Sequence, residues 1–260
     1  MEIELPKNGY SPAVPTPDLV ETGFRQAAVV IPAHDEAKNL PKTLRAVLTA
    51  AACAPVPVDI VVVLDNCSDT SEGLAGRYGP DVHFVTVAAG NVGAARAAGF
   101  SYARSLSGES EDDRTWYATT DADSKVDPDW LLRQICSGAD MVLGVVRVSD
   151  WRTLSPAAVR RYLTDYHAGG SAGSHDHIHG ANMGFRADAY WAAGGFRALA
   201  TGEDVELVDR FAAAGYRIHR DAGLSVTTSA RAQGRAPGGF AQHLRAVSKS
   251  VRHPAAKDPA

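Results

Sequence analysis

Two aspartates separated by one small residue, Asp121 and Asp123, give the strongest sign of chemistry in this sequence. They come two threonines after the apolar run Trp116–Ala118, which is typical of a buried strand. Carboxylate oxygens suit Mg²⁺ and Mn²⁺, and Mg²⁺ is commonly shared between such carboxylates and substrate phosphates. An Asp-x-Asp pair is also common in turns, so its place at a strand end is what favours a divalent-cation site.

Three further strand candidates are also followed by polar or glycine residues. His34 and Glu36 come after the first, Asp65 after the second, and the glycine-rich run Gly90–Arg96 after the third. The Asp65 carboxylate can accept a hydrogen bond from the ring N–H of uracil, while backbone N–H groups of 90–96 can face a phosphate. Ligands of open parallel sheets bind beyond the carboxyl ends of the strands. We therefore expect these groups to share one site.

The elements that must position these residues alternate between strand and helix. Apolar runs rich in β-branched residues predict strands over 27–31, 58–64, 82–87, 115–119 and 141–148. Helical patterns are expected from Asn39, from Asp69 towards Tyr78, from Asn91 towards Leu106, and from Asp127. This alternation predicts an α/β domain with a mainly parallel sheet covered on both faces. Later in the chain, helices are expected from Ser155 and over 203–214, and strands over 216–219 and 224–228.

The main domain is expected to span residues 27–228, with a nucleotide-binding half at 27–145 and an acceptor and catalytic half at 146–228. Residues 1–26 carry four prolines and no apolar period, so they predict an extended arm. Residues 229–260 carry six cations against one acid and an apolar helical face. This terminal helix either packs on the domain with its basic face in water or contacts an anionic membrane surface or a phosphorylated ligand.

Composition and charge exclude several classes of function. The 260 residues are 45% hydrophobic and 22% charged, as in an ordinary globular protein. The net charge of −4 argues against a nucleic-acid partner, which requires an excess of Lys and Arg. No run has the length of a membrane span, and the start lacks the pattern of a signal peptide, so a cytoplasmic location is expected. Three scattered cysteines predict neither disulfides nor a zinc site.

Six short motifs between residues 27 and 220 resemble, in their order, those of family-2 glycosyltransferases with the GT-A fold. They are Val29–Glu36, Leu64–Asp69, Asn91–Arg96, Asp121–Asp123, Gly180–Gly184 with Gly194–Phe196, and Gly202–Asp204. The resemblance implies a Rossmann-like three-layer sandwich around a mainly parallel sheet. It also implies transfer of a sugar from a nucleotide-diphosphate sugar, with UDP as the expected nucleotide, to an acceptor hydroxyl with inversion. The Gln-x-x-Arg-Trp motif of processive members is absent, which indicates transfer of one sugar.

The resemblance also implies roles for the matching residues. Asp204 would be the general base, with Glu203 beside it, and Asp123 would bind Mg²⁺ or Mn²⁺ with Asp121 close to the ribose or sugar. The residues implied to contact the donor are Pro32, His34, Glu36, Asp65 on the uracil, Arg96 near the phosphates, and Arg231 and Arg235 in a closing loop. His34 departs from the tyrosine often found in the family, and Cys67 departs from the usual glycine or serine.

A histidine-rich segment leaves alternatives open. His175, His177 and His179 alternate along the chain and can bind a transition metal, as in a metal-dependent hydrolase. One of His177, His179 and His219 can instead supply a third ligand to a metal held by Asp123. A G-x-S-x-G match at 169–173 lacks the strand–turn–helix context of a hydrolase nucleophile. An inactive nucleotide-sugar-binding homologue is the non-enzymatic alternative.

Overall fold

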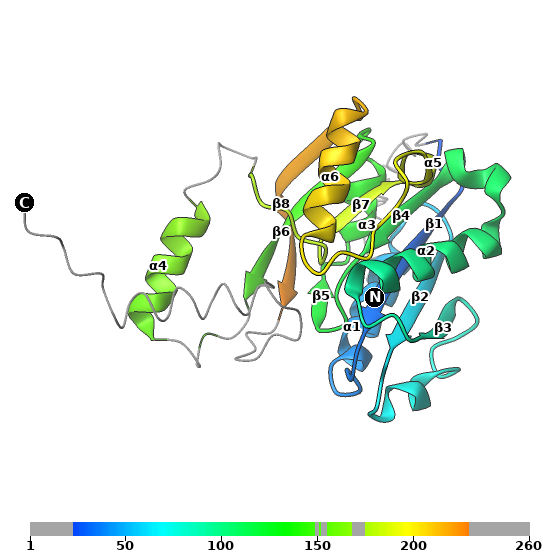
Figure 1. The fold of residues 1–260 in the computed structure, drawn as a ribbon, viewed down its shortest axis with the longest axis horizontal. Helices are drawn as coiled ribbons and strands as arrows, with labels where there is room; N and C mark the ends of the chain where they lie inside the picture. Colours follow the sequence, from blue (N-terminus) through cyan, green and yellow to red (C-terminus); the bar gives the residue numbers. More distant parts are fainter. Residues whose placement is uncertain (1–22, 149–150, 152–154, 168–174, 229–260) are drawn as a thin grey trace, which may run out of the picture.

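The computed structural model describes residues 23–148, 151, 155–167 and 175–228 (Figure 1). Most of the proposed arm, the basic segment 229–260 with Arg231 and Arg235, and the G-x-S-x-G match lie outside the described residues. In the described part, no helix is both long and apolar enough to cross a membrane.

One eight-stranded mixed sheet runs through the described part of the chain in the order β3-β2-β1-β4-β7-β6-β8-β5. Strands β3, β2, β1 and β4 are parallel, β7 is antiparallel to both of its neighbours, β6 and β8 are parallel, and β5 is antiparallel to β8. The strands are β1 (Gln26–Ala33), β2 (Val58–Asp65), β3 (Val82–Val87), β4 (Thr115–Thr119), β5 (Ser124–Val126), β6 (Met141–Val148), β7 (Met183–Arg186) and β8 (Ile218–Thr228). The expected α/β fold with a mainly parallel sheet is confirmed, and the sheet crosses the proposed boundary near residue 145. The division into two halves stays a prediction.

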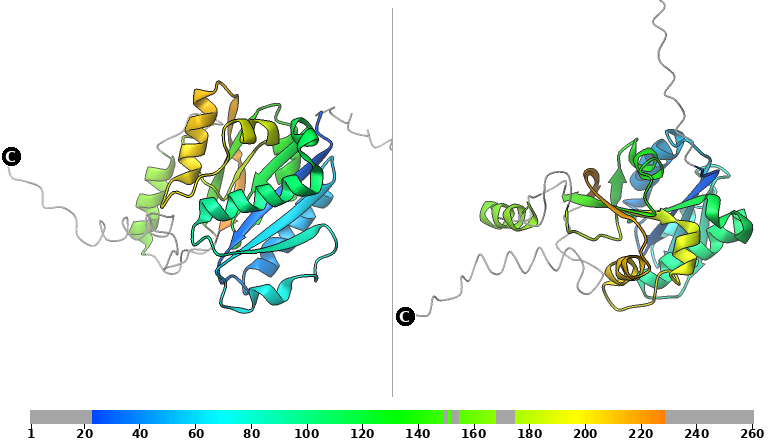
Figure 2. Two further views of the ribbon diagram at one scale, coloured as in Figure 1. Left: turned by 45° about the vertical axis from the view of Figure 1, so that its right-hand side comes forward. Right: turned by 90° about the horizontal axis from the view of Figure 1, so that it is seen from above.

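Helices cover both faces of this sheet, which gives three layers (Figure 2). On one face lie α1 (Leu40–Ala52) and α3 (Trp130–Ile135), packed on alternate residues of β1 such as Val29 and Ile31. The other face carries α2 (Val92–Ser107), α5 (Ala187–Ala192) and α6 (Glu203–Ala213), packed on the intervening residues Ala28 and Val30. Since both faces are covered, β1 and β2 are apolar without alternation, as parallel strands in such folds are.

Several helix boundaries differ from their predictions. The helix expected from Asp69 towards Tyr78 is only a 3₁₀ helix, Thr70–Leu74, because the chain passes soon afterwards through Gly76 and Gly79 with positive φ. Asn39 does not cap α1; its side chain donates to Glu36 Oε2 at 2.9 Å instead. Asn91 does cap α2, accepting the N–H of Ala94 at 2.9 Å.

The strands of the C-terminal half also differ. The two strands expected over 216–219 and 224–228 form one strand, β8, which is irregular in its pairing with β6 between Gly144 and Val145. Strands β5 and β7 and helix α5 have 3, 4 and 6 residues and were not predicted. The helix expected from Ser155 is α4 (Pro156–His167).

Candidate functional site

The Asp-x-Asp turn lies at the carboxyl end of β4, between that strand and β5. Ala122 and Ser124 are buried, and the Ala122 carbonyl accepts the hydroxyl of Thr43 from α1 at 2.8 Å. Asp121 and Asp123 remain partly exposed, and the Asp121 side chain is 42% accessible. The Thr228 hydroxyl at the end of β8 donates to Asp123 Oδ1 at 3.4 Å. The turn is thus fixed from its buried side, and its two carboxylates lie on the solvent side.

Arg96 on α2 does not open towards solvent, as a free phosphate ligand would. Its side chain is only 3% accessible, and its Nη2 donates to Asp121 Oδ1 at 2.9 Å while Nη1 donates to Glu203 Oε1. Its guanidinium also lies over the Phe196 ring, 5.5 Å from the centroid. The implied role of Arg96 at the donor phosphates stays a prediction, because in this structure both terminal nitrogens bind carboxylates.

The two acids expected to hold the general base begin α6. Glu203 is buried against Arg96, whereas Asp204 is partly exposed. The Asp204 carboxylate accepts the N–H of Gly180 at 2.8 Å on Oδ2 and the N–H of Val205 at 2.9 Å on Oδ1. The positive end of the helix dipole favours a carboxylate here. The side chain is therefore oriented by two backbone donors.

Gly180 lies between Arg96 of α2 and Asp204 of α6 and contacts both. A Cβ added at this position would lie 2.6 Å from Arg96 Nη1, so any larger residue would have to displace the guanidinium from its two carboxylates. Asp121, Arg96, Gly180 and the first turn of α6 consequently form one connected group. The structure brings the Asp-x-Asp turn and the helix start that carries the expected base to the two sides of a single buried arginine.

The surroundings of Asp121 change its acidity. Enclosure by the protein raises the pKa of its carboxyl above the ordinary aspartate value, although part of the side chain reaches solvent. Arg96 opposes this increase in pKa, and the neighbouring carboxylates of Glu203 and Asp204 add to it. Crowding of like charges of this kind is typical of a place that binds a cation.

At the carboxyl end of β2, Asp65 holds a loop. Its carboxylate accepts three backbone N–H groups, from Ala89 at 2.8 Å, Gly90 at 2.9 Å and Asn91 at 3.1 Å. A carboxylate offers about four acceptor positions, so most are occupied. The implied contact of Asp65 with uracil stays a prediction, and its observed contacts position the start of α2.

His34 follows β1 with a half-exposed ring, and its Nδ1 lies 2.7 Å from the Asp65 carbonyl oxygen. Because a carbonyl oxygen can only accept, Nδ1 carries the proton, and in the neutral ring Nε2 is an acceptor. Pro32 is part of β1, opposite Val63. Glu36 is buried, and its N–H donates to Ser71 Oγ at 3.2 Å. Of Pro32, His34 and Glu36, only His34 has a side chain exposed enough to contact a ligand.

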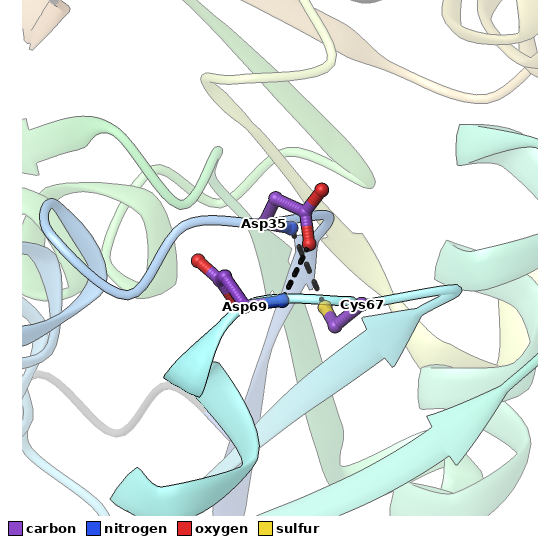
Figure 3. Close-up of side chains that lie close together, drawn as sticks. All are labelled: Asp35, Cys67 and Asp69. Carbon is purple, nitrogen blue, oxygen red and sulfur yellow. Dashed lines mark hydrogen bonds between the residues drawn. The ribbon is translucent and has the colours of Figure 1, made fainter.

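Asp35, Cys67 and Asp69 join the loops that follow β1 and β2 (Figure 3). Asp35 Oδ1 accepts the N–H of Ser68 at 2.6 Å and that of Asp69 at 3.0 Å, and the Asp35 N–H points to Cys67 Sγ at 3.4 Å. The bond from Ser68 is the main cause of a lowered pKa at Asp35. Cys67, in place of a smaller residue, thus adds a loop-to-loop contact.

The three histidines do not form a metal site. Their Nε2 atoms have separate partners: the Leu143 carbonyl for His175 at 3.1 Å, the Tyr166 carbonyl for His177 at 2.7 Å, and the Tyr166 hydroxyl for His179 at 3.2 Å. The His177 ring is stacked on Tyr166 with centroids 3.7 Å apart. These contacts hold α4 to the segment before β7.

The histidine alternatives are therefore wrong as metal sites. Within the described residues, only Asp35, Cys67 and Asp69 bring three ligand atoms within 4.8 Å of one another, so neither the histidine trio nor a histidine with Asp121 and Asp123 does so. His219 lies near the start of β8, whereas Asp123 contacts Thr228 at its end. Along β6, the residues paired with His219 and Thr228 are Val142 and Val148, which puts the two ends roughly 20 Å apart, so His219 does not reach Asp123.

Two exposed cations near the Asp-x-Asp turn were not predicted as site residues. Lys125 and Arg147 both pair with Thr227, from β5 and β6 on either side of β8. The next row, Val126, Val226 and Val146, is buried on the α1 face, so the cations lie on the opposite face. The sequence could not predict this row, because it depends on the pairing of β5, a strand of only three residues.

A Rossmann-like sheet with a carboxylate pair at its rim and an acidic helix start beside it are the features of the GT-A fold. The chain belongs to glycosyl transferase family 2, whose family model matches residues 28–194. A search of curated protein sequences finds no significant match.

Solved structures share the fold. TarS of S. aureus, residues 1–349 in complex with UDP-GlcNAc, is 14% identical with a TM-score of 0.57, over 88% of this chain and 67% of that one. The same TarS fragment in another structure gives 13% and 0.56, and there this chain spans only 60% of its length. The mannosyltransferase PcManGT from Pyrobaculum calidifontis, in complex with GDP-Man and Mn²⁺, is 17% identical with a TM-score of 0.57, over 92% and 78% of the chains.

Proposed function

We propose that this glycosyltransferase moves one sugar from a UDP-sugar to an acceptor hydroxyl by a single, inverting, metal-dependent displacement. The observation that carries the proposal is the arrangement around Arg96, which binds Asp121 of the Asp-x-Asp turn and Glu203 beside the expected base. Binding of UDP-GlcNAc by TarS and of GDP-Man with Mn²⁺ by PcManGT supports the donor class.

The donor atoms at the turn suit a divalent cation. Asp123 would hold Mg²⁺ or Mn²⁺ with its carboxylate, and Asp121 would contribute the oxygen that Arg96 does not engage. When bound, such a cation would act as a Lewis acid that stabilises negative charge on the leaving diphosphate.

Asp204 performs the proton transfer in this scheme. A hydroxyl is a weak nucleophile, so the carboxylate takes its proton as the acceptor oxygen bonds to the anomeric carbon. The bond from that carbon to the diphosphate oxygen breaks in the same step, and its electron pair leaves with UDP. The N–H groups of Gly180 and Val205 keep the carboxylate in place for this transfer.

Other residues complete donor binding in the proposal. His34 and Asp65 would lie at the nucleoside end of the donor, where the half-exposed ring of His34 can contact it. Lys125 and Arg147 supply positive charge for the diphosphate, since Arg96 is already engaged with carboxylates. Arg231 and Arg235 remain proposed for a loop that closes over the donor and excludes water.

The test is a panel of nucleotide sugars, assayed by thermal shift and by release of the nucleoside diphosphate, with Mn²⁺ and with excess chelator. We expect one UDP-sugar to raise the melting temperature most and to be slowly hydrolysed only with the metal. Stabilisation by no nucleotide sugar would contradict the proposal, and equal turnover in chelator would remove the metal from it. A hydrolase of other substrates would show neither a thermal shift nor release of a nucleoside diphosphate with any nucleotide sugar of the panel.

A further inference from the structure

We propose that Arg96 is a positioning residue that couples the cation site at Asp121 to the base at Asp204. The inference rests on the proposed function and deepens it. It assigns Arg96 to the carboxylates on either side of it and not to the donor phosphates.

Arg96 is too deeply buried to contact a donor phosphate in this arrangement. A phosphate ligand must present its guanidinium to the donor, but this side chain is 3% accessible and both terminal nitrogens are bound to carboxylates. Its planar fork suits two separate acceptors at once, which a lysine ammonium does not match. Arg96 therefore fixes Asp121 and Glu203 relative to each other.

Two close glycine contacts show that this geometry is constrained from both sides. A Cβ at Gly180 would lie 2.6 Å from Arg96 Nη1, and a Cβ at Gly93 would lie 3.0 Å from Cβ of Glu203 and closer still to the Arg197 carbonyl. The start of α2 thus packs closely on the segment around the start of α6, and the segment before β7 packs closely on the Arg96 guanidinium. A change in the position of Glu203 must also move Asp204, whose Oδ2 is bound to Gly180.

The charges around Arg96 also affect how the Asp-x-Asp turn would bind a cation. Arg96 is the cation bound between the Asp121 and Glu203 carboxylates, and Asp204 is the next residue after Glu203. While Arg96 donates to one Asp121 oxygen, it competes for the negative charge that a divalent cation would use. Loss of Arg96 should therefore strengthen cation binding and at the same time release the base from its position.

Stronger cation binding together with slower turnover would distinguish this positioning role from a phosphate-binding role. We would compare Arg96→Lys and Arg96→Met/Glu203→Gln with the wild type. The double variant removes the partner charge that would otherwise be left buried and unpaired, so it has the better prospect of folding. Arg104→Met is the matched control, because Arg104 lies on the same helix and pairs with Asp112 away from the turn.

Three quantities would be measured: Mn²⁺ affinity of the full chain without donor, affinity for UDP with Mn²⁺ saturating, and turnover. In the double variant the negative charge of Glu203 is lost together with the positive charge of Arg96, so we expect Mn²⁺ to bind only about twofold more tightly, through the Asp121 oxygen that Arg96 releases. UDP affinity should change less than about twofold, and turnover should fall by about 10²-fold because the base is misplaced. Arg96→Lys should change Mn²⁺ affinity and turnover in the same directions by less. The control should leave Mn²⁺ affinity unchanged.

Tenfold weaker UDP binding with unchanged Mn²⁺ affinity would overturn the proposal and make Arg96 a phosphate ligand. Unchanged Mn²⁺ affinity and turnover in folded variants would overturn it in favour of packing alone. If the wild type itself binds neither Mn²⁺ nor UDP, the proposed function fails first, so the two failures are distinguishable.

Discussion

The backbone N–H of Gly180 donates to Asp204 Oδ2 at 2.8 Å, which joins the segment before β7 to the first turn of α6. The two residues are 24 positions apart, and the same glycine also packs against the Arg96 guanidinium. Gly180 thus holds the Asp204 carboxylate, the proposed base, by its amide, and its missing side chain leaves room for Arg96.

Gly180→Ala should therefore lower both stability and turnover. The added methyl group would overlap Arg96, and relief of such overpacking costs about 1–3 kcal/mol. Chemical denaturation and turnover would be measured together. Gly73→Ala is the control, since a Cβ there meets nothing within 4 Å. An alanine at 180 that leaves turnover unchanged would show that the contact does not hold the base.

Asp204→Asn should abolish proton acceptance while keeping the shape of the side chain. We expect turnover to fall by about 10²-fold or more, with donor affinity nearly unchanged. Asp209→Asn, on an exposed position of the same helix, is the control and should retain turnover. A loss of donor affinity as large as the loss of turnover would make Asp204 a binding residue. Retention of the donor's anomeric configuration in the product would replace the single-displacement scheme.

Lys125→Ala and Arg147→Ala should each weaken donor binding, and the double variant should weaken it more. Both cations lie in one row with Thr227 on the exposed face, so they act on an anion through a partly hydrated surface. Their contribution should decrease as salt increases. Titration of UDP at two ionic strengths measures this. Lys42→Ala, on α1 over the other face of the sheet, should have no effect. Unchanged UDP affinity in the double variant would assign the row to the acceptor or to the surface.

Acidification should destabilise the protein partly through His175. Burial lowers the pKa of this histidine below its ordinary value, because the charged ring is disfavoured in the interior. The unfolded chain consequently takes up a proton that the folded one refuses, and stability is lost as the pH falls below about 6.5. Denaturation midpoints between pH 8 and pH 5 should fall less steeply in His175→Gln than in the wild type. Parallel curves would contradict the assignment.

The sequence predicted the long elements well and their contacts poorly. Strands β3 and β6 have the predicted bounds, since each is rich in apolar and β-branched residues and lies between turns. Strands β5 and β7 are too short for periodicity to reveal, and the two runs of β8 belong together only because β6 pairs with both. The alternation of strands and helices along the chain was therefore enough to predict the fold class. Strands β5 and β7 could not be predicted, because they form only by pairing with strands distant in sequence.

The same limit applies to the site. The carboxylates at the strand ends could be named from the sequence because apolar strands precede them. The partners of Arg96 could not be, since Glu203 is 107 positions away and pairing at that distance leaves no local pattern. The alternating histidines looked like ligands by type and spacing, but backbone carbonyls and Tyr166 take their Nε2 atoms.

The most direct test of the central claim is the Mn²⁺ dependence of UDP-sugar turnover in wild type and in Asp123→Ala. The Asp123 side chain lies on the solvent side of its turn and contributes little to the core, so the variant should fold. The account predicts turnover in the wild type that saturates with Mn²⁺ and vanishes in excess chelator, and none in the folded variant at any Mn²⁺ concentration. Full turnover by Asp123→Ala, or by the wild type in chelator, would contradict it.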